Sequence, residues 1–522
     1  MTSIDNGRLE FALQTLAETC GGPGAAVAVL KEGQVLVRHA WGLADRERRI
    51  PFTPRTLMPM CSITKQFTCA LALDRLGSFD VLDPQLPARL PLLHGPRPSA
   101  LHLATNQSGL RDYWALTVLC GAQPDGEFRP QDARDLIGRT LSTQFAPGHL
   151  FSYSNGNFRL LADMLEERTG ETLGDMLRRR LWEPAGMEWA QHAPETSRAP
   201  GDVVGYEESA NGGYIPVTNR IHWSGDAGMV ACLDDMIAWE REIDRRRGDS
   251  DAPYNRISAP QHFSDGTPAS YGLGLGHGQV AGRPVTGHSG GLRGFRAHRM
   301  HVASERLSVV VMMNHEAAAW TAASTLAEAA LGWSAPAAGM LPADDGWLGA
   351  YLDPSTGLSL LVERTADGGL AGRFGSRPEP LAVSAEGEAK GPSLRLRRRL
   401  DDGLDLERAG DNLRTSVIRL PMTVDSVPEG DFWSEELRAG LRIASFGGVP
   451  HAGFDGFLGR GPMERMRSLG GDVWLLACRR SLDAPSPWDW TLRVERDRAA
   501  RAMRVTVGCW LARQVRFERA TA

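Results

Sequence analysis

The sequence predicts an α+β protein in which a first domain, residues 1–332, combines an antiparallel sheet with helices. Two small antiparallel β-barrel domains are expected to follow, over residues 340–420 and 421–522. Up to residue 330, apolar residues at helical spacing alternate with short strand-like runs. A segment rich in proline, alanine and glycine, residues 334–345, is typical of a linker. Beyond it, short strand-like runs alternate with glycine and aspartate turns, which favours barrels.

The predicted elements of the first domain fall into one sheet and several helices. Residues 25–37 form a hairpin with its turn at 31–33, and residues 285–288 and 307–313 form two later strands. We expect these strands to share one antiparallel sheet. Helical spacing predicts helices over 56–76, 158–169 and 172–181, the second ending at Gly170.

A weak internal repeat supports two similar β-domains. Gly349-Ala350-Tyr351 is followed by a Gly-Leu strand at 357–360, and Gly430-Asp431-Phe432 by another at 440–443. The two copies lie about 80 residues apart, a spacing that indicates a duplicated unit.

Composition excludes several classes of function. A net charge of -5 and a pI near 6.3 leave no basic surface for nucleic acid or for an anionic membrane. No apolar run is long enough to span a bilayer, and residues 1–8 lack the features of a signal peptide. Seven scattered cysteines without a CxxC pair favour reduced thiols, so we expect a cytoplasmic protein. No HExxH or comparable ligand set occurs among the 13 histidines, and neither a metal nor another cofactor is expected.

Lysine is scarce, and one lysine has a suggestive neighbour. Only three of the 58 basic residues are lysines, and one of these, Lys65, follows Ser62 by three positions at the start of an apolar helical run. Residues three apart share a helix face, so the two side chains can meet. A serine hydroxyl needs a base, and lysine, unlike arginine, can lose its proton when burial lowers its pKa. An ordinary helix start with a solvated lysine is the alternative.

Two further motifs could complete such a site. Tyr153 could relay a proton and Asn155 could bind a substrate carbonyl, although for a single YxN motif a simple loop with Asn157 as helix N-cap is the favoured alternative. His288, Ser289 and Gly290 follow a strand-like run, where a backbone of small residues could approach an acyl substrate. A glycine-rich turn with an incidental histidine is the alternative reading of that segment.

The order of SxxK, YxN and HxG resembles the superfamily of serine β-lactamases and penicillin-binding proteins. The tyrosine and the histidine are similar to the branch of class C β-lactamases, D,D-peptidases and related esterases. Residues 106–110 and 224–229 also resemble segments of that branch, so the resemblance spans residues 25–330. It implies a β-lactamase/D,D-peptidase-like catalytic domain in which Ser62, Lys65, Tyr153 and His288 are catalytic.

The whole chain resembles the bacterial D-stereospecific aminopeptidases of this superfamily, through residues 106–116, 480–487 and 507–513. This resemblance implies two eight-stranded barrels, a loop at 479–489 that reaches the active site, and a homodimer. It implies release of N-terminal D-residues, D-Ala above all, from peptides, amides and esters. Asp483 is then the expected partner of the substrate ammonium, because a buried cation needs a carboxylate. Gly276 and His277 stand where the family has a polar residue, which leaves detailed specificity open.

Three rival functions stay open at this point. A D,D-carboxypeptidase or β-lactamase on the same scaffold would bind a substrate carboxylate, and only Arg293 and Arg296 lie near the third motif in sequence. An esterase would differ in its turnover of amides. A non-catalytic binding protein is disfavoured, because decay usually removes one of the four catalytic residues.

Overall fold

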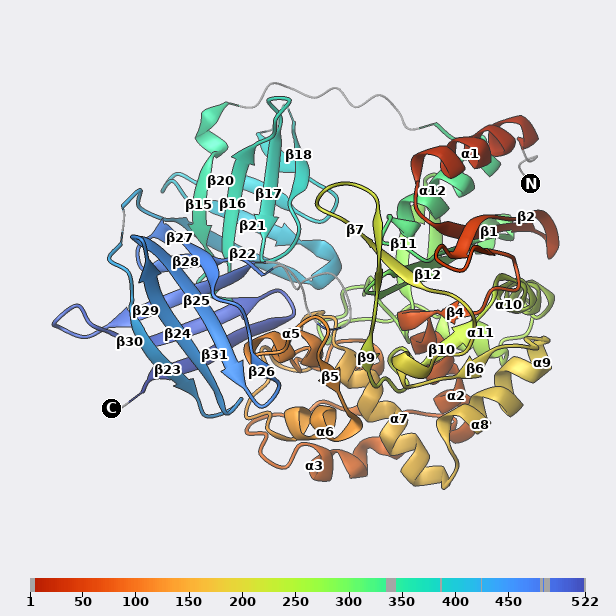
Figure 1. Cartoon of the computed structure of the whole chain (residues 1–522), viewed down its shortest axis with the longest axis horizontal. Helices are drawn as coiled ribbons and strands as arrows, with labels where there is room; N and C mark the ends of the chain where they lie inside the picture. Colours follow the sequence, from red (N-terminus) through yellow and green to blue (C-terminus); the bar gives the residue numbers. More distant parts are fainter. Residues whose placement is uncertain are drawn as a thin grey trace.

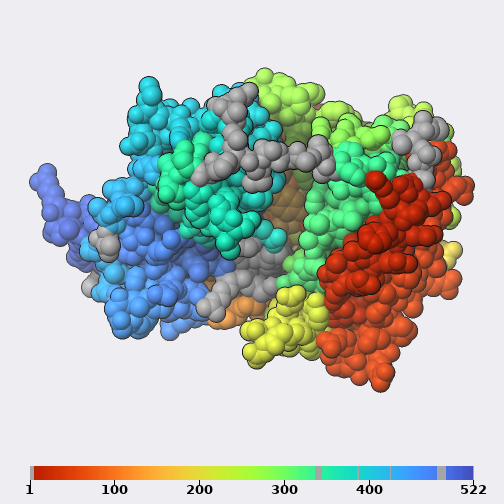
Figure 2. All heavy atoms as spheres, turned by 90° about the horizontal axis from the view of Figure 1, so that it is seen from above, coloured from red at the N-terminus to blue at the C-terminus, as the bar shows by residue number. Residues whose placement is uncertain are grey.

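The computed structural model describes residues 5–334, 344–384, 387–423, 425–478, 482 and 489–520. The N-terminal α/β part and the C-terminal β-structure lie at opposite ends of the molecule (Figure 1). From above, the red N-terminal segment and the blue C-terminal part again lie far apart, with green segments between them (Figure 2).

A seven-stranded sheet forms the centre of the N-terminal part, in the order β11-β12-β13-β14-β1-β2-β3. Its strands, in that order, are Gly276–Val280, Arg283–Leu292, Phe295–Val302, Leu307–Met313, Gly24–Lys31, Gln34–Asp45 and Ile50–Pro51. All of its strand pairs are antiparallel, and β1 lies between β14 and β2. The predicted sharing of one sheet by the early hairpin and the two late strands is confirmed.

Helices cover both faces of this sheet. Because side chains alternate along a strand, Ala25, Val27 and Val29 of β1 face α1 and α12, whereas Ala26 and Ala28 face the larger helical layer. The helices are α1 Asn6–Thr19, α2 Thr64–Leu76, α3 Leu86–Arg89, α4 Ala100–Ala104, α5 Tyr113–Leu119, α6 Pro130–Gly138, α7 Asn155–Thr169, α8 Leu173–Leu177, α9 Glu183–Ala185, α10 Leu233–Arg245, α11 Pro253–Ile257 and α12 Ala319–Ala330. Short strands are β4 Met58–Pro59, β5 Glu127–Phe128, β6 Gln191–His192, β7 Gly205–Glu208, β8 Tyr214–Val217, β9 Arg220–Ile221 and β10 Met229–Ala231.

The helix predicted over 56–76 is wrong in its first half. Met58–Pro59 is a buried strand that pairs with β10, a turn of 3₁₀ helix covers Cys61–Ile63, and α2 begins only at Thr64. Proline drives the residue before it into the extended region, so helical spacing of apolar residues cannot continue through Met58.

Two closed antiparallel barrels follow. The first consists of β15 Gly349–Leu352, β16 Ser359–Arg364, β17 Leu370–Phe374, β18 Glu379–Val383, β19 Glu388–Lys390, β20 Arg395–Arg398, β21 Leu404–Arg408 and β22 Leu413–Arg419. The second consists of β23 Gly430–Ser434, β24 Ala439–Phe446, β25 Val449–Gly456, β26 Gly459–Arg460, β27 Glu464–Gly470, β28 Val473–Leu476, β29 Trp490–Arg496, β30 Ala502–Cys509 and β31 Ala512–Arg519. Pairing of β24 with β25 closes it, and β26 is attached to β25. The predicted α+β class with two barrels is confirmed.

The sequence repeat corresponds to a repeated structural device. Gly349 and Gly430 open the first strand of each barrel at φ 151° and 145°, a region that favours glycine. In each case an arginine of the last strand lies over the aromatic ring two residues later, Arg419 4.8 Å from the Tyr351 ring and Arg519 4.9 Å from that of Phe432. A Cβ on either glycine would also meet the end of that arginine side chain, which is flexible, so the positive φ is the stronger reason for glycine at both positions.

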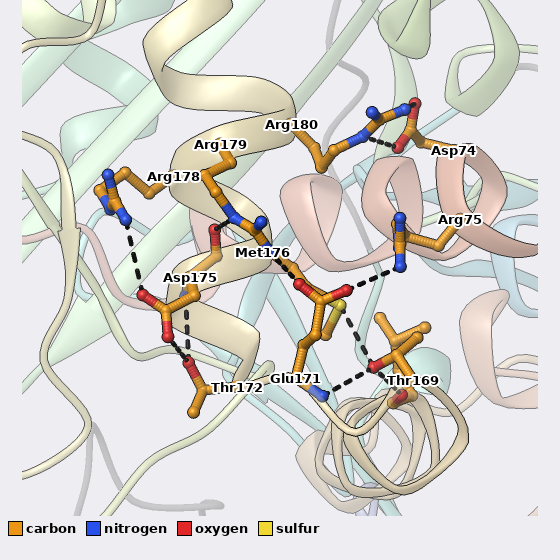
Figure 3. A network of polar contacts seen from close by, with 11 residues as sticks. Asp74, Arg75, Thr169, Glu171, Thr172, Asp175, Met176, Arg178, Arg179 and Arg180 are labelled. Carbon is orange, nitrogen blue, oxygen red and sulfur yellow. Dashed lines mark hydrogen bonds and ion pairs between the residues drawn. The ribbon is translucent and has the colours of Figure 1, made fainter.

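A surface ion-pair network fixes the far end of α2 (Figure 3). Asp74 accepts from Arg180 at 2.7 Å, and Arg75 donates to Glu171 at 2.8 Å. Glu171 also pairs with Arg179. The network therefore ties α2 to the segment around α8.

A buried ion pair lies between the sheet and α10. Breaking it should lower the free energy of unfolding more than breaking a pair in the surface network. The Arg299 and Glu240 side chains are both fully buried and contact each other at 2.6 Å. We expect Glu240→Gln to lower the free energy of unfolding by about 3–5 kcal/mol, because it leaves a buried guanidinium uncompensated. The matched Glu171→Gln variant, at a partly exposed pair, should cost at most about 1 kcal/mol. Denaturant titration of both variants measures this, and equal losses would contradict it.

Candidate active site

Ser62 lies in a tight turn just before α2. Among Cys61–Lys65 it alone is partly exposed, and Cys61 before it has φ 52°, a left-handed conformation that a side chain adopts only at a cost. Thr64 holds the turn by donating to the Cys61 carbonyl at 2.6 Å. The turn thus presents one hydroxyl while burying its neighbours.

Lys65 is fully buried, and three acceptors surround its amine. Nζ lies 2.9 Å from Ser62 Oγ, 2.7 Å from Asn155 Oδ1 and 2.7 Å from the Asp226 carbonyl oxygen. These contacts come from three separate segments. A neutral amine can donate its two N–H groups to the Asn155 and Asp226 oxygens and direct its lone pair at the Ser62 hydroxyl. The ring of Tyr153 lies 4.9 Å from the same nitrogen.

Asp112 holds Asn155 from behind. Its Oδ1 accepts from the Asn155 backbone N–H at 2.7 Å and from Nδ2 at 3.0 Å, which leaves Asn155 Oδ1 aimed at Lys65. Burial raises the pKa of the Asp112 carboxyl to about 6, while the bonds from Asn155 oppose this shift. Asn155 is the first residue of α7 and Ser154 is its N-cap, so Asn157, the cap of the alternative reading, lies inside the helix.

The second barrel reaches this support through its β30–β31 turn. The Asp112 backbone N–H donates to the Leu511 carbonyl at 2.9 Å. Arg111 Nε donates to the Arg513 carbonyl at 2.7 Å, and the Arg513 N–H donates to Gln144 at 3.0 Å. The C-terminal barrel is thus in direct contact with the residue that positions Asn155.

His288 lies on the opposite wall as a neutral side chain. Burial, and secondarily the nearby Lys65, lower its pKa to about 3. Nδ1 lies 2.6 Å from the Ser289 carbonyl, which can only accept, so Nε2 is left to accept from the Tyr271 hydroxyl at 2.9 Å. The Tyr153 ring packs against both His288 and Tyr271.

β12 approaches the Ser62 turn along its glycines. A Cβ on Gly290 would lie 2.3 Å from the Met60 carbonyl, so only glycine allows this contact. Ser289 points to the other face, where its hydroxyl lies 2.7 Å from His298 Nδ1. Within the described chain, β11 pairs with β12 only as far as Gly287, so the edge of β12 from His288 onward has no neighbouring strand.

The structure thus brings Ser62, Lys65, Tyr153, Asn155, His288 and Gly290 together. It places the Ser289 hydroxyl elsewhere, and Asp483 lies outside the described residues, as does most of the predicted 479–489 loop. Sequence reasoning missed the parts played by three further residues, Asp112, Asp226 and Tyr271. The first two lie inside the segments that carried the family resemblance, but no spacing rule singled them out, and nothing in the sequence marked Tyr271.

The described residues hold no close group of three His, Cys, Asp or Glu side chains suited to a metal ion. None of the described helices combines the length and apolar character needed to cross a membrane.

Comparison with known proteins identifies families for both parts of the chain. Residues 11–332 match the β-lactamase family, and residues 341–518 match the family described as D-aminopeptidase, domain B. The D-aminopeptidase of Brucella melitensis biotype 2 (strain ATCC 23457) is 46% identical over 519 residues, covering 99% of this chain and 100% of that protein.

Two solved structures share the fold at lower identity. The octameric penicillin-binding protein homologue from Pyrococcus abyssi has a TM-score of 0.55 and 21% identity, covering 80% of this chain and 100% of that one. The D-amino acid amidase from Ochrobactrum anthropi SV3, complexed with L-phenylalanine amide, has a TM-score of 0.50 and 20% identity, covering 62% and 97%.

Fold and site geometry together define a serine hydrolase of the β-lactamase type. With its domain B and its full-length likeness to the Brucella protein, the chain belongs to the D-aminopeptidase family.

Asp112 gives a pH-dependent prediction. Since burial raises its pKa from 3.8 to about 6, kcat/KM should fall below pH 6 as the carboxyl that holds Asn155 becomes protonated. Asp112→Asn should lower kcat/KM by about 10- to 100-fold and abolish this acidic limb. A pH–rate profile of both proteins measures this, and an unchanged limb in the variant would contradict it.

Stability provides the matching readout. A raised folded-state pKa means that Asp112 contributes stability below about pH 4 and that this contribution is lost as pH rises through 6. The Asn variant should lack this component of the pH dependence of unfolding. A residue needed only for folding would change the pH dependence of unfolding alone, whereas Asp112 should change the pH dependence of both unfolding and kcat/KM.

Proposed function

We propose that this enzyme releases N-terminal D-residues, D-Ala preferentially, from peptides, amides and esters through an acyl-enzyme on Ser62. The observation that carries the proposal is the 2.9 Å contact between Lys65 Nζ and Ser62 Oγ, made by a fully buried lysine. A buried amine next to a partly exposed hydroxyl is the arrangement that nucleophilic catalysis by serine requires.

In the proposed acylation step, Ser62 Oγ attacks the carbonyl carbon of the first residue while Lys65 takes the hydroxyl proton. The C–N bond then breaks, and the proton passes from Lys65 through Tyr153 to the leaving amine, so that both residues return to their starting state. Backbone N–H groups of Ser62 and of β12 beyond His288 stabilise the oxyanion. In deacylation Tyr153 takes a proton from a water as the water attacks the acyl carbon. The bond from that carbon to Ser62 Oγ breaks, the same proton is returned to Oγ, and the free amino acid leaves.

The unpaired edge of β12 supports an extended substrate. A peptide can lie alongside this edge as an added strand and pair with its backbone groups, because the pairing of β11 ends at Gly287. Neutral His288 at this edge favours uncharged substrate groups near the scissile bond.

Asp483 is the proposed partner of the substrate's ammonium group. Leu482, which precedes it in the sequence, is buried, and a Cβ on Gly126 would lie 3.3 Å from it. Asp125, next to that glycine, pairs with Arg293 at the Leu292 end of β12. We therefore assign the amino end of the substrate to this end of the strand.

The rival carboxypeptidase function needs a cation, and the two candidates are already engaged. Arg293 contacts Glu207 at 2.7 Å, and Arg296 contacts Glu316 at 3.2 Å. Their charges are thereby neutralised, which favours the aminopeptidase over an enzyme that binds a substrate carboxylate.

We also propose that the enzyme is a cytoplasmic homodimer. Scattered cysteines without a paired motif support a reducing compartment. Light scattering and cell fractionation address these two points.

The activity is tested by hydrolysis of D-Ala-p-nitroanilide, L-Ala-p-nitroanilide and N-acetyl-D-Ala-p-nitroanilide. We expect turnover of the free D-amine alone, because the ammonium must pair with Asp483. Asp483→Asn should raise KM for the free amine and narrow its advantage over the acetylated compound. Equal or better turnover of the acetylated substrate by the unmodified enzyme would favour an esterase or D,D-peptidase.

The nucleophile has its own test. Ser62→Ala should lower kcat by about 10⁴- to 10⁶-fold while leaving the unfolding midpoint unchanged. A fluorophosphonate probe should label the unmodified protein but not this variant, and Lys65→Arg should slow labelling because arginine cannot accept the proton. Activity retained in Ser62→Ala, or no labelling of the unmodified protein, would overturn the assignment.

A further inference from the structure

A pocket lies beside the active site at the edge of the large sheet. Its volume is about 320 Å³, and it is lined by strands β11 and β12, by His298 of β13 and by Trp320 of α12. Tyr153, Tyr271 and His288 form its rim on the side of the nucleophile. The pocket therefore adjoins the proposed catalytic residues Tyr153 and His288, which form part of its lining.

Two glycines of β11 make room for this pocket. A Cβ on Gly276 would meet only the Gly287 carbonyl, at 3.4 Å, and one on Gly278 only Val285 Cγ1, at 3.7 Å. These positions therefore tolerate a side chain, and a side chain there would occupy the pocket. Glycine is disfavoured within strands, yet β11 has two glycines, separated by one residue, at positions where a side chain would fit. We therefore expect the space that they leave to have a function.

The described lining carries no formal charge. None of its members is Asp, Glu, Lys or Arg, and burial lowers the pKa of both His288 and His298 to about 3. Trp320 closes one side with its ring edge-on to His298, 4.8 Å away between centroids. Such a lining suits an aromatic or apolar group. It offers a carboxylate no charged partner, only polar groups such as the ring nitrogens of His277 and His298, so the cost of desolvating a full charge is not offset.

The position along β12 indicates which part of the substrate enters. Gly290 packs against the turn that carries Ser62, and the proposed ammonium site lies toward Leu292. The pocket lies in the opposite direction, past His288 and Gly287, and Tyr153 at its rim is the proposed proton donor to the leaving amine. A substrate stretched along this edge therefore points its leaving group into the pocket.

We propose that this pocket binds the substituent on the leaving nitrogen and that the enzyme prefers uncharged aromatic or apolar leaving groups. This inference rests on the proposed function, because it takes the departing amine from the same acylation step. Substrates of this class are D-aminoacyl arylamides and peptides whose second residue is apolar and lacks a free carboxylate. A dipeptide would bring its carboxylate to the uncharged pocket and react more slowly.

The test compares leaving groups with and without a substituent. D-alanine anilide fills the pocket, whereas D-alanine amide releases ammonia and leaves it empty. Gly278→Val adds a strand-compatible side chain into the open space and should lower kcat/KM for the anilide by about tenfold or more. Its effect on the amide should stay within twofold, because that substrate has nothing to place in the pocket.

Further experiments test the effect of a charged leaving group and the contribution of Trp320 to the pocket wall. In the unmodified enzyme, D-alanine 4-carbamoylanilide should react at least about tenfold faster than the nearly isosteric 4-carboxyanilide. Trp320→Ala opens one wall to water and should reduce this ratio toward one. Trp433→Ala on β23 is the matched control, because its exposed fraction of 44% is close to the 43% of Trp320 and it lies in the second barrel.

The outcomes separate the two proposals. If no D-aminoacyl compound is cleaved, the proposed function itself fails. If D-alanine amide and anilide are both cleaved but Gly278→Val affects them equally or not at all, the enzyme stands and the leaving-group pocket is wrong. A 4-carboxyanilide that reacts as fast as the carbamoyl compound would also overturn the pocket.

Discussion

The buried amine of Lys65 is the constraint on which the rest of the site depends. A charged or strongly polar nitrogen removed from water is costly unless its donors are satisfied, and here acceptors arrive from the nucleophile turn, from α7 and from the 224–229 segment. Each acceptor fixes the segment that supplies it. The geometry that satisfies the lysine therefore also sets where Ser62 and Asn155 lie.

Support for this amine extends outward in a continuous series of contacts. Asn155 is held by Asp112, and Asp112 is held through its backbone by Leu511 of the second barrel. The second barrel thus contacts the framework of the active site from far along the chain, as the 402-residue separation of the Arg111–Arg513 bond shows. The barrel therefore helps to hold Asp112 and, through it, Asn155.

The sequence predicted most of what depends on local pattern. The paired positions of Ser62 and Lys65, the hairpin at residues 25–37 and the barrel repeat all followed from spacing and turn chemistry. The start of α2 did not, because a proline and a left-handed Cys61 overrode helical spacing. Asp112 and Asp226 escaped notice since their importance arises from contacts across long separations, which no single segment encodes.

Two glycines, Gly290 in β12 and Gly278 in β11, show why the role of a residue cannot be predicted from its type alone. At Gly290 the missing side chain lets one strand approach the nucleophile turn, since a Cβ would lie 2.3 Å from a carbonyl oxygen. At Gly278 the missing side chain leaves empty space, since the nearest atom would be 3.7 Å away. In sequence the two glycines are the same letter, twelve positions apart in neighbouring strands. Gly290 is required because any side chain would prevent the close contact with the Ser62 turn, whereas Gly278 leaves a space that a side chain would fill. The same residue type at this sheet edge therefore helps to position the Ser62 hydroxyl and leaves room for the leaving group of the substrate.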